Sequence, residues 1–181
     1  MQLQLRWLKR TLKNSYYLRI LAPYKSGAFF ISGLSVNNYM KDQYIQAFYD
    51  IVCETKNIHG YELPVELESY IVFLLASHID RPDFLPETTF AESLLKLQKP
   101  YTQNAKELGD TCLFVTGVFP EYGTRNGLNI TYYSNIGKSS YSMAKQYLNL
   151  ELFENLSTHF DFLRNFIDTA INKQNQPLNL R

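Results

Sequence analysis

Cysteine is scarce in this chain, since Cys53 and Cys112 are the only two among 181 residues. Two cysteines do not make the disulfide framework of a secreted scaffold, and both lie in apolar segments, where a free thiol usually packs as a small hydrophobic group. No apolar run approaches the roughly 18–20 residues that a membrane-spanning helix needs. The start of the chain mixes arginine and lysine with leucine and holds no continuous apolar stretch typical of a secretory signal. We therefore expect a cytoplasmic protein.

Motifs for catalysis and for metal binding are also lacking. None of His59, His78 and His159 has a carboxylate three residues before it, so the Glu-x-x-His pair of di-iron bundles is missing. The sequence has neither the His-Glu-x-x-His of zinc proteases nor the Gly-x-Ser-x-Gly of a nucleophile elbow. We expect neither a metal ion nor a cofactor, and no motif identifies a catalytic residue.

Acidic residues are absent from positions 1–41, which carry seven positive charges, whereas the rest of the chain has eleven positive and seventeen negative ones. The basic side chains that define an N-terminal arm within residues 1–36 are Arg6, Lys9, Arg10, Lys13, Arg19 and Lys25. Such an arm could bind nucleic acid or an anionic membrane surface, or it could fold back onto the acidic body of its own chain or of a second copy. The charges are spaced along the arm and not clustered, which favours the second interpretation.

Apolar residues at helical spacing dominate the sequence and predict an all-α fold. We expect one domain over residues 1–181, a bundle of about six to eight helices, with a frayed tail at 174–181. Residues 14–34 could form either a hairpin or two helical pieces. The predicted helices cover 38–57, 63–78, 89–97, 103–118, 131–149 and 150–173, and residues 121–129 form an exposed, turn-rich loop.

One predicted helix, 63–78, is apolar on every side around Phe73. Pro64 suits its first turn, acidic residues follow in that turn, and His78 lies near its end. A helix without a polar face is expected at the centre of a core. We therefore predict that the segment around Phe73 is buried by the other helices.

Small residues are placed within predicted helices of the 105–144 stretch, at Ala105, Gly109, Gly117 and Gly137. A glycine inside a helix costs about 1 kcal/mol relative to alanine, so a close approach of another backbone or of a ligand should offset it. These four positions are the candidates for close packing.

Asp110 lies on a mostly apolar predicted helix, where an unpaired carboxylate would be costly if buried. Its partner could be Arg125, Tyr132 or Tyr141, in a structural hydrogen bond or in a pocket. The sharper interpretation is a ligand-binding pocket, and its candidate residues are Asp110, Glu121, Tyr132, Tyr133 and Tyr141.

The same stretch carries a pattern that resembles a family. It reads Leu108-Gly109-Asp110, then Phe114-x-x-Gly117-x-Phe119-Pro120-Glu121, then Tyr132-Tyr133 and Gly137-x-x-x-Tyr141. Over about 40 residues this is similar to a group of bacterial cytoplasmic helical proteins that have no assigned activity. The resemblance implies a bacterial, single-domain helical protein, and it brings no cofactor, substrate or catalytic residue.

Three functions stay open at this point. The first is a non-catalytic helical interaction or regulatory protein. It would form a homodimer, with helix 103–118 in a tight helix–helix contact, or bind an unknown protein partner. The second is an enzyme or a small-ligand binder with the Tyr- and Asp-lined pocket. The third is nucleic-acid or membrane-surface binding through the basic arm.

Overall fold

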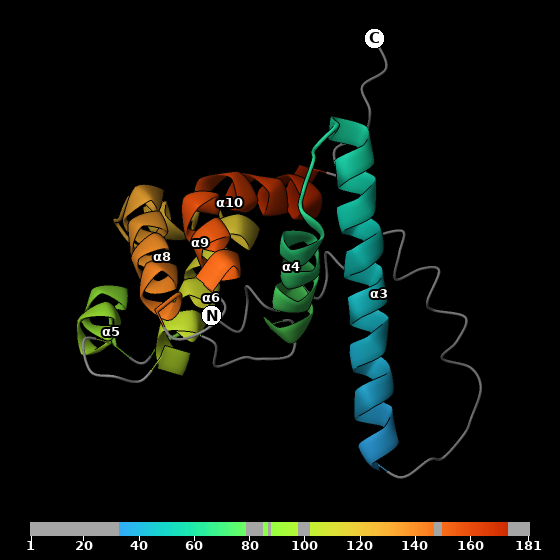
Figure 1. Ribbon diagram of the computed structural model, residues 1–181, viewed down its shortest axis with the longest axis horizontal. Helices are drawn as coiled ribbons and strands as arrows, with labels where there is room; N and C mark the ends of the chain where they lie inside the picture. The colour runs from blue at the N-terminus through green and yellow to red at the C-terminus, as the bar shows by residue number, and fades with distance from the viewer. Residues whose placement is uncertain (1–32, 79–84, 87, 98–101, 147–149, 174–181) are drawn as a thin grey trace.

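The computed structural model describes residues 33–78, 85–86, 88–97, 102–146 and 150–173. These ranges contain α-helices, a π-helical turn and no strand, so the predicted all-α bundle is confirmed (Figure 1). The elements are α3 (Gly33–His59), α4 (Val65–His78), α5 (Phe90–Lys96), α6 (Thr102–Val118), α7 (Tyr122–Arg125), α8 (Ile130–Ala144), α9 (Leu150–Thr158), α10 (Phe160–Asp168) and the π-helix η2 (Thr169–Lys173).

Helix α3 stands at one edge of the molecule, beside α4 (Figure 1). Its 27 residues span about 40 Å. The predicted apolar stripe faces the core, where Phe48, Ile51, Val52 and Thr55 are buried. The Thr55 hydroxyl donates to the Ile51 carbonyl at 2.8 Å, so the stripe leaves no unpaired polar group at this position.

The start of α3 revises one predicted boundary. Residues 33–36, which we expected to belong to the basic arm, form the first turn of α3. The remainder of the arm, with its six basic side chains, and the tail 174–181 lie outside the described residues. The choice between a hairpin and helical pieces in residues 14–34 falls there as well, apart from the two residues that open α3.

Helix α4 begins at Val65, two residues later than predicted, and it has Glu66 and Glu68 in its first turn and His78 at its end, as expected. Ile71 and Leu75 are buried in the core, with 0% and 1% of their surface exposed. Phe73, however, is 57% exposed, so the expectation that this segment is buried on every side is wrong at its central residue. The reason is that α3 packs on one side of α4 and α6 and α9 on another, and the face between them stays open.

The glycines of α6 and α8 lie where helices approach closely. A Cβ atom at Gly109 would stand 2.7 Å from the Tyr141 ring, and one at Gly117 would stand 2.7 Å from Cγ2 of Ile167. At Gly137 the added atom would meet the Phe160 ring and the Cβ atom of Cys112. These neighbours all belong to the same chain, and Ala105 is likewise buried, with 3% of its surface exposed.

Two predicted elements differ in their boundaries. Helix α8 ends at Ala144, not at 149, and the loop at 121–129 contains the single helical turn α7. The loop's turn is present, since Gly127 has a φ of +70° that suits glycine.

The predicted helix 150–173 is divided at His159 into α9, α10 and η2. His159 has φ −96° and ψ 13°, outside the helical region. The division lets α9 pack against α4 and α8 while α10 crosses α6 in another direction (Figure 1). Tertiary packing therefore overrides a hydrophobic pattern that is continuous in the sequence.

Candidate functional site

A buried carboxylate joins three helices at the centre of the molecule. Asp110, on α6, has 6% of its surface exposed. Its Oδ1 atom accepts hydrogen bonds from the hydroxyl of Tyr70 on α4, at 2.6 Å, and from that of Tyr141 on α8, at 2.9 Å. Its Oδ2 atom pairs with the ammonium group of Lys106, one turn earlier on α6, at 2.5 Å. We call these four residues the Asp110 network.

The environment keeps both tyrosines of the Asp110 network protonated. Burial, together with the nearby charge of Asp110, raises the pKa of Tyr141 and the pKa of Tyr70. Each hydroxyl therefore keeps its proton at ordinary pH and donates a hydrogen bond to the carboxylate. Tyr141 is completely enclosed, whereas Tyr70 is half-buried.

Lys106 connects the Asp110 network to the outside. Its side chain is 38% exposed, against 9% for the side chain of Asp110. The ammonium nitrogen also lies 5.3 Å from the centroid of the Tyr70 ring, close enough for a cation–π interaction. The lysine is thus held at its tip by a carboxylate and an aromatic face while part of it meets solvent.

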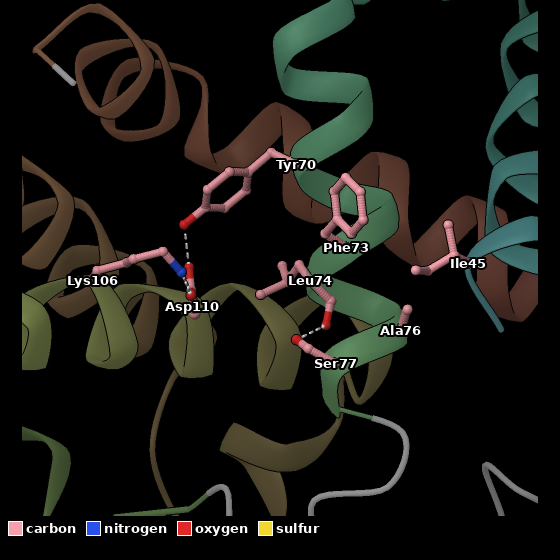
Figure 2. Close-up of a pocket in the computed structure, with 8 residues that line it drawn as sticks. All are labelled: Ile45, Tyr70, Phe73, Leu74, Ala76, Ser77, Lys106 and Asp110. Carbon is pink, nitrogen blue, oxygen red and sulfur yellow. Dashed lines mark hydrogen bonds and ion pairs between the residues drawn. The ribbon is translucent and has the colours of Figure 1, made fainter. Parts of the chain in front are cut away.

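A hollow of about 290 Å³ opens beside these groups, between α3, α4 and α6. Lys106 and Asp110 approach α4 from one side and Ile45, on α3, from the other (Figure 2). The lining residues are Ile45, Tyr70, Phe73, Leu74, Ala76, Ser77, Lys106 and Asp110. The Ser77 hydroxyl donates to the Leu74 carbonyl at 3.0 Å, so it is already paired. The lining residues next to it, Phe73, Leu74 and Ala76, are apolar. The pocket combines one charged end with an apolar remainder.

The structure brings together only two of the five predicted pocket residues. Asp110 lines the pocket, and Tyr141 lies behind it as one of the three predicted hydrogen-bond partners. Arg125, another predicted partner, instead pairs with Glu121 at 2.9 Å on an exposed surface. Because an α-helix rises 1.5 Å per residue, Tyr133 lies about 12 Å from Tyr141 along α8.

An aromatic cluster accounts for the remaining two predicted residues. The Tyr133 ring packs edge-on against Tyr132, Tyr122 and Phe90, with centroids 5.0 to 5.5 Å apart. This cluster joins α5, α7 and α8, away from the hollow. Glu121, Tyr132 and Tyr133 therefore do not belong to the pocket, and the predicted grouping is corrected to Asp110 and Tyr141.

Several pocket residues were not predicted from the sequence. Lys106 stands four residues before Asp110, the spacing of helical ion pairs, and this signal was readable. Tyr70, Phe73 and Ser77 follow the i, i+3, i+7 spacing of one helix face, so they form an aromatic and polar stripe on an otherwise apolar helix. That stripe was the second available signal.

A second polar cluster links α3 to α4. The buried Glu68 carboxylate pairs with the Lys56 ammonium and accepts a hydrogen bond from the Cys53 thiol, with sulfur and oxygen 3.7 Å apart. The hydrogen bond to Glu68 raises the pKa of Lys56. Cys53 is half-buried, and Cys112 is fully buried in the core, where burial raises the pKa of its thiol. The cluster fastens two helices and opens into no described cavity.

Among the described residues, no three His, Cys, Asp or Glu side chains gather as metal ligands would. None of the described helices combines the length and the apolar character needed to cross a bilayer.

The predicted family pattern runs through this site, since its Leu-Gly-Asp part places Gly109 against Tyr141 and Asp110 in the Asp110 network. Membership in that family stays a prediction. No protein-family model matches the chain, and no curated protein or solved structure is significantly similar to it.

Proposed function

We propose that this protein is a non-catalytic binding protein that holds a small ligand with an apolar body in the pocket between α3, α4 and α6. The observation that carries the proposal is the pairing of a 290 Å³ hollow with an exposed phenylalanine at its edge. Ligand pockets have volumes of about 300–1,000 Å³. This hollow lies just below that range, so it suits a compact molecule.

The exposed ring of Phe73 favours the binding of an apolar ligand in the pocket. This ring leaves roughly 100 Å² of apolar surface in water, because an aromatic side chain can bury about 150–250 Å² and 57% of this one is exposed. Covering that surface would stabilise a complex by up to about 2.5 kcal/mol. Ile45 and Leu74 provide further apolar wall for the same ligand.

The polar groups of the site support binding and not catalysis. The Asp110 carboxylate already accepts from three donors, so it is not a free general base. The tyrosine hydroxyls have raised pKa values and are not nucleophiles at ordinary pH. The pocket thus offers contact area and one ammonium group.

A fluorescence titration with N-phenyl-1-naphthylamine, a neutral apolar probe, tests the proposal. We expect saturable binding at one site and at least about tenfold weaker binding by Phe73→Ser, a loss of about 1.4 kcal/mol. The matched control is Phe162→Ser, because Phe162 is also exposed, at 38%, but lies on α10 and does not line the pocket. Circular dichroism verifies that both variants stay folded. Equal binding by the two variants would contradict the proposal.

Self-association, an unknown protein partner, and nucleic-acid or membrane binding through the basic arm remain predictions. The arm lies outside the described residues. The tight contacts of α6, which favoured the interaction hypothesis, are made within the chain, as described for Gly109 and Gly117. We therefore place small-ligand binding first.

A further inference from the structure

The ammonium group of Lys106 has hydrogen-bonding capacity to spare. It carries three N–H donors. One is directed to Asp110 Oδ2, and the Tyr70 ring face lies 5.3 Å from the nitrogen. No other hydrogen-bond acceptor within the described part of the chain contacts it. A ligand in the pocket therefore meets a partly exposed cation with an unused donor.

Asp110 offers much less to a ligand. Two hydroxyls occupy Oδ1 and the lysine occupies Oδ2, which uses three of the roughly four lone-pair positions of a carboxylate. A cationic ligand would have to displace Lys106 or approach it against like-charge repulsion. An anionic ligand would leave the network intact and add to it.

The two tyrosines also favour an anionic over a cationic ligand. The hydroxyls of Tyr70 and Tyr141 both donate to Oδ1 and so stabilise the carboxylate, while Lys106 stays the partner of Oδ2. Asp110 and Lys106 are the only charged residues that line the pocket within the described ranges. Lys106 is the more exposed of the two, so a ligand that enters from solvent meets the ammonium group before the carboxylate.

From this geometry we infer that the ligand is a small amphiphilic organic anion, whose acidic group pairs with Lys106 while its apolar body lies against Phe73, Leu74 and Ile45. This inference rests on the proposed function. Lys106 is then the specificity-determining residue, and Asp110 is a positioning residue that acts through it. The chemistry required of the ligand is one negatively charged oxygen group at one end of a compact hydrocarbon or aromatic body.

A matched pair of probes tests the charge. 8-Anilinonaphthalene-1-sulfonate is N-phenyl-1-naphthylamine with a sulfonate added, so the two differ by one anionic group. We expect Lys106→Gln to weaken binding of the sulfonate about tenfold more than it weakens binding of the neutral probe, because only the sulfonate loses a charge-assisted hydrogen bond. Added salt should weaken only the sulfonate.

The control variant is Lys145→Gln. Lys145 is also 38% exposed and also paired with a carboxylate, that of Glu154 at 3.5 Å, but it lies at the end of α8 outside the pocket. It should change neither titration. Lys106→Arg keeps the charge and should retain most of the preference for the sulfonate, which provides a second variant if Lys106→Gln does not fold.

The failures of the two proposals are distinguishable. If the neutral probe binds and Lys106→Gln weakens both probes equally or neither, the anion inference is wrong and the pocket stands. If the neutral probe binds the wild-type protein more tightly than the sulfonate does, Asp110 dominates the pocket and the inference is again wrong. If neither probe binds the wild-type protein, the proposed function and the inference fall together.

Discussion

Tyr141→Phe removes a single oxygen atom from the centre of the protein. The side chain is completely buried, and its hydroxyl donates to Asp110 Oδ1 at 2.9 Å. Hydrogen bonds to charged groups contribute roughly 1.5–3 kcal/mol. We therefore expect the variant to lower the free energy of unfolding by about 2 kcal/mol, a large part of the roughly 5–15 kcal/mol typical of a domain.

Urea unfolding followed by far-ultraviolet circular dichroism measures this loss. The control is Tyr132→Phe on the same helix, which makes the same chemical change in a half-buried tyrosine that packs against Tyr133. No hydroxyl hydrogen bond of Tyr132 is found among the described residues. Its variant should stay within about 0.5 kcal/mol of the wild-type protein.

A double-mutant cycle with Asp110→Asn separates this interaction from general packing. Asparagine keeps the shape of the side chain and removes its charge, so it weakens the same hydrogen bond from the acceptor side. Because Tyr141 and Asp110 are in direct contact, their two losses should not add, and we expect a coupling of about 1 kcal/mol or more. Simple additivity, or a Tyr141→Phe loss no larger than that of the control, would refute the role given to the Asp110 network.

Three further predictions concern stability. In Gly137→Ala the added Cβ atom would stand 2.5 Å from Cζ of Phe160. Overpacking of this kind costs roughly 1–3 kcal/mol, and the gain in helix propensity offsets roughly 1 kcal/mol of it. The variant should therefore lose up to about 2 kcal/mol of unfolding free energy and have a lower melting temperature. The raised pKa values of Tyr70 and Tyr141 predict that the free energy of unfolding is unaffected by these groups' titration below about pH 10 and falls above it. Above that pH only the unfolded chain releases the two protons, so each group lowers the stability by up to about 1.4 kcal/mol per pH unit. Urea titrations between neutral and strongly alkaline pH check this, and an unchanged midpoint would contradict it. Thr89→Ala removes the N-cap of α5 and should lower the free energy of unfolding by about 1 kcal/mol, which urea unfolding at neutral pH measures.

Local signals in the sequence predicted much of the fold. The apolar stripe of α3 from Phe48 to Thr55 is buried. The start of the predicted helix 89–97 also has a local cause, since Thr89 and Glu92 exchange the two hydrogen bonds of a capping box. These features depend on residues within two or three turns of one helix, so the sequence contains them directly.

The exposure of Phe73 could not be predicted in the same way. The centre of helix α4 is apolar around its circumference, and only the short stripe that Tyr70 and Ser77 form with Phe73 marks the open side. Which side stays open depends on where α3 and α6 pack against it. The division at His159 has the same origin, because the apolar pattern continues across it while the partners of α9 and α10 differ.

The candidate site shows the same limit. Tyr141 was one of three predicted partners of Asp110, because both residues lie in the stretch with unusual glycines and tyrosines. Tyr70 is 40 residues away from Asp110, on a helix that the sequence marks only as apolar. Tyr132 and Tyr133 share the composition of that stretch, but the length of α8 carries them to the aromatic cluster at its other end.

The burial of α6 bears on the prediction that the protein self-associates. Every residue from Leu108 to Val118 is buried, so this helix presents no face to a second copy over that span. A dimer contact there would first require α6 to separate from α8, which would break the hydrogen bond between Asp110 and Tyr141 and expose the ring packed over Gly109. The packing of residues 108–118 is therefore accounted for within the protomer, and self-association stays a prediction. A dimer contact of α6 would have to use its first turns, where Asn104 and Glu107 are exposed. Substitutions of the glycines of α6 should therefore change the stability of the protomer and not its state of association.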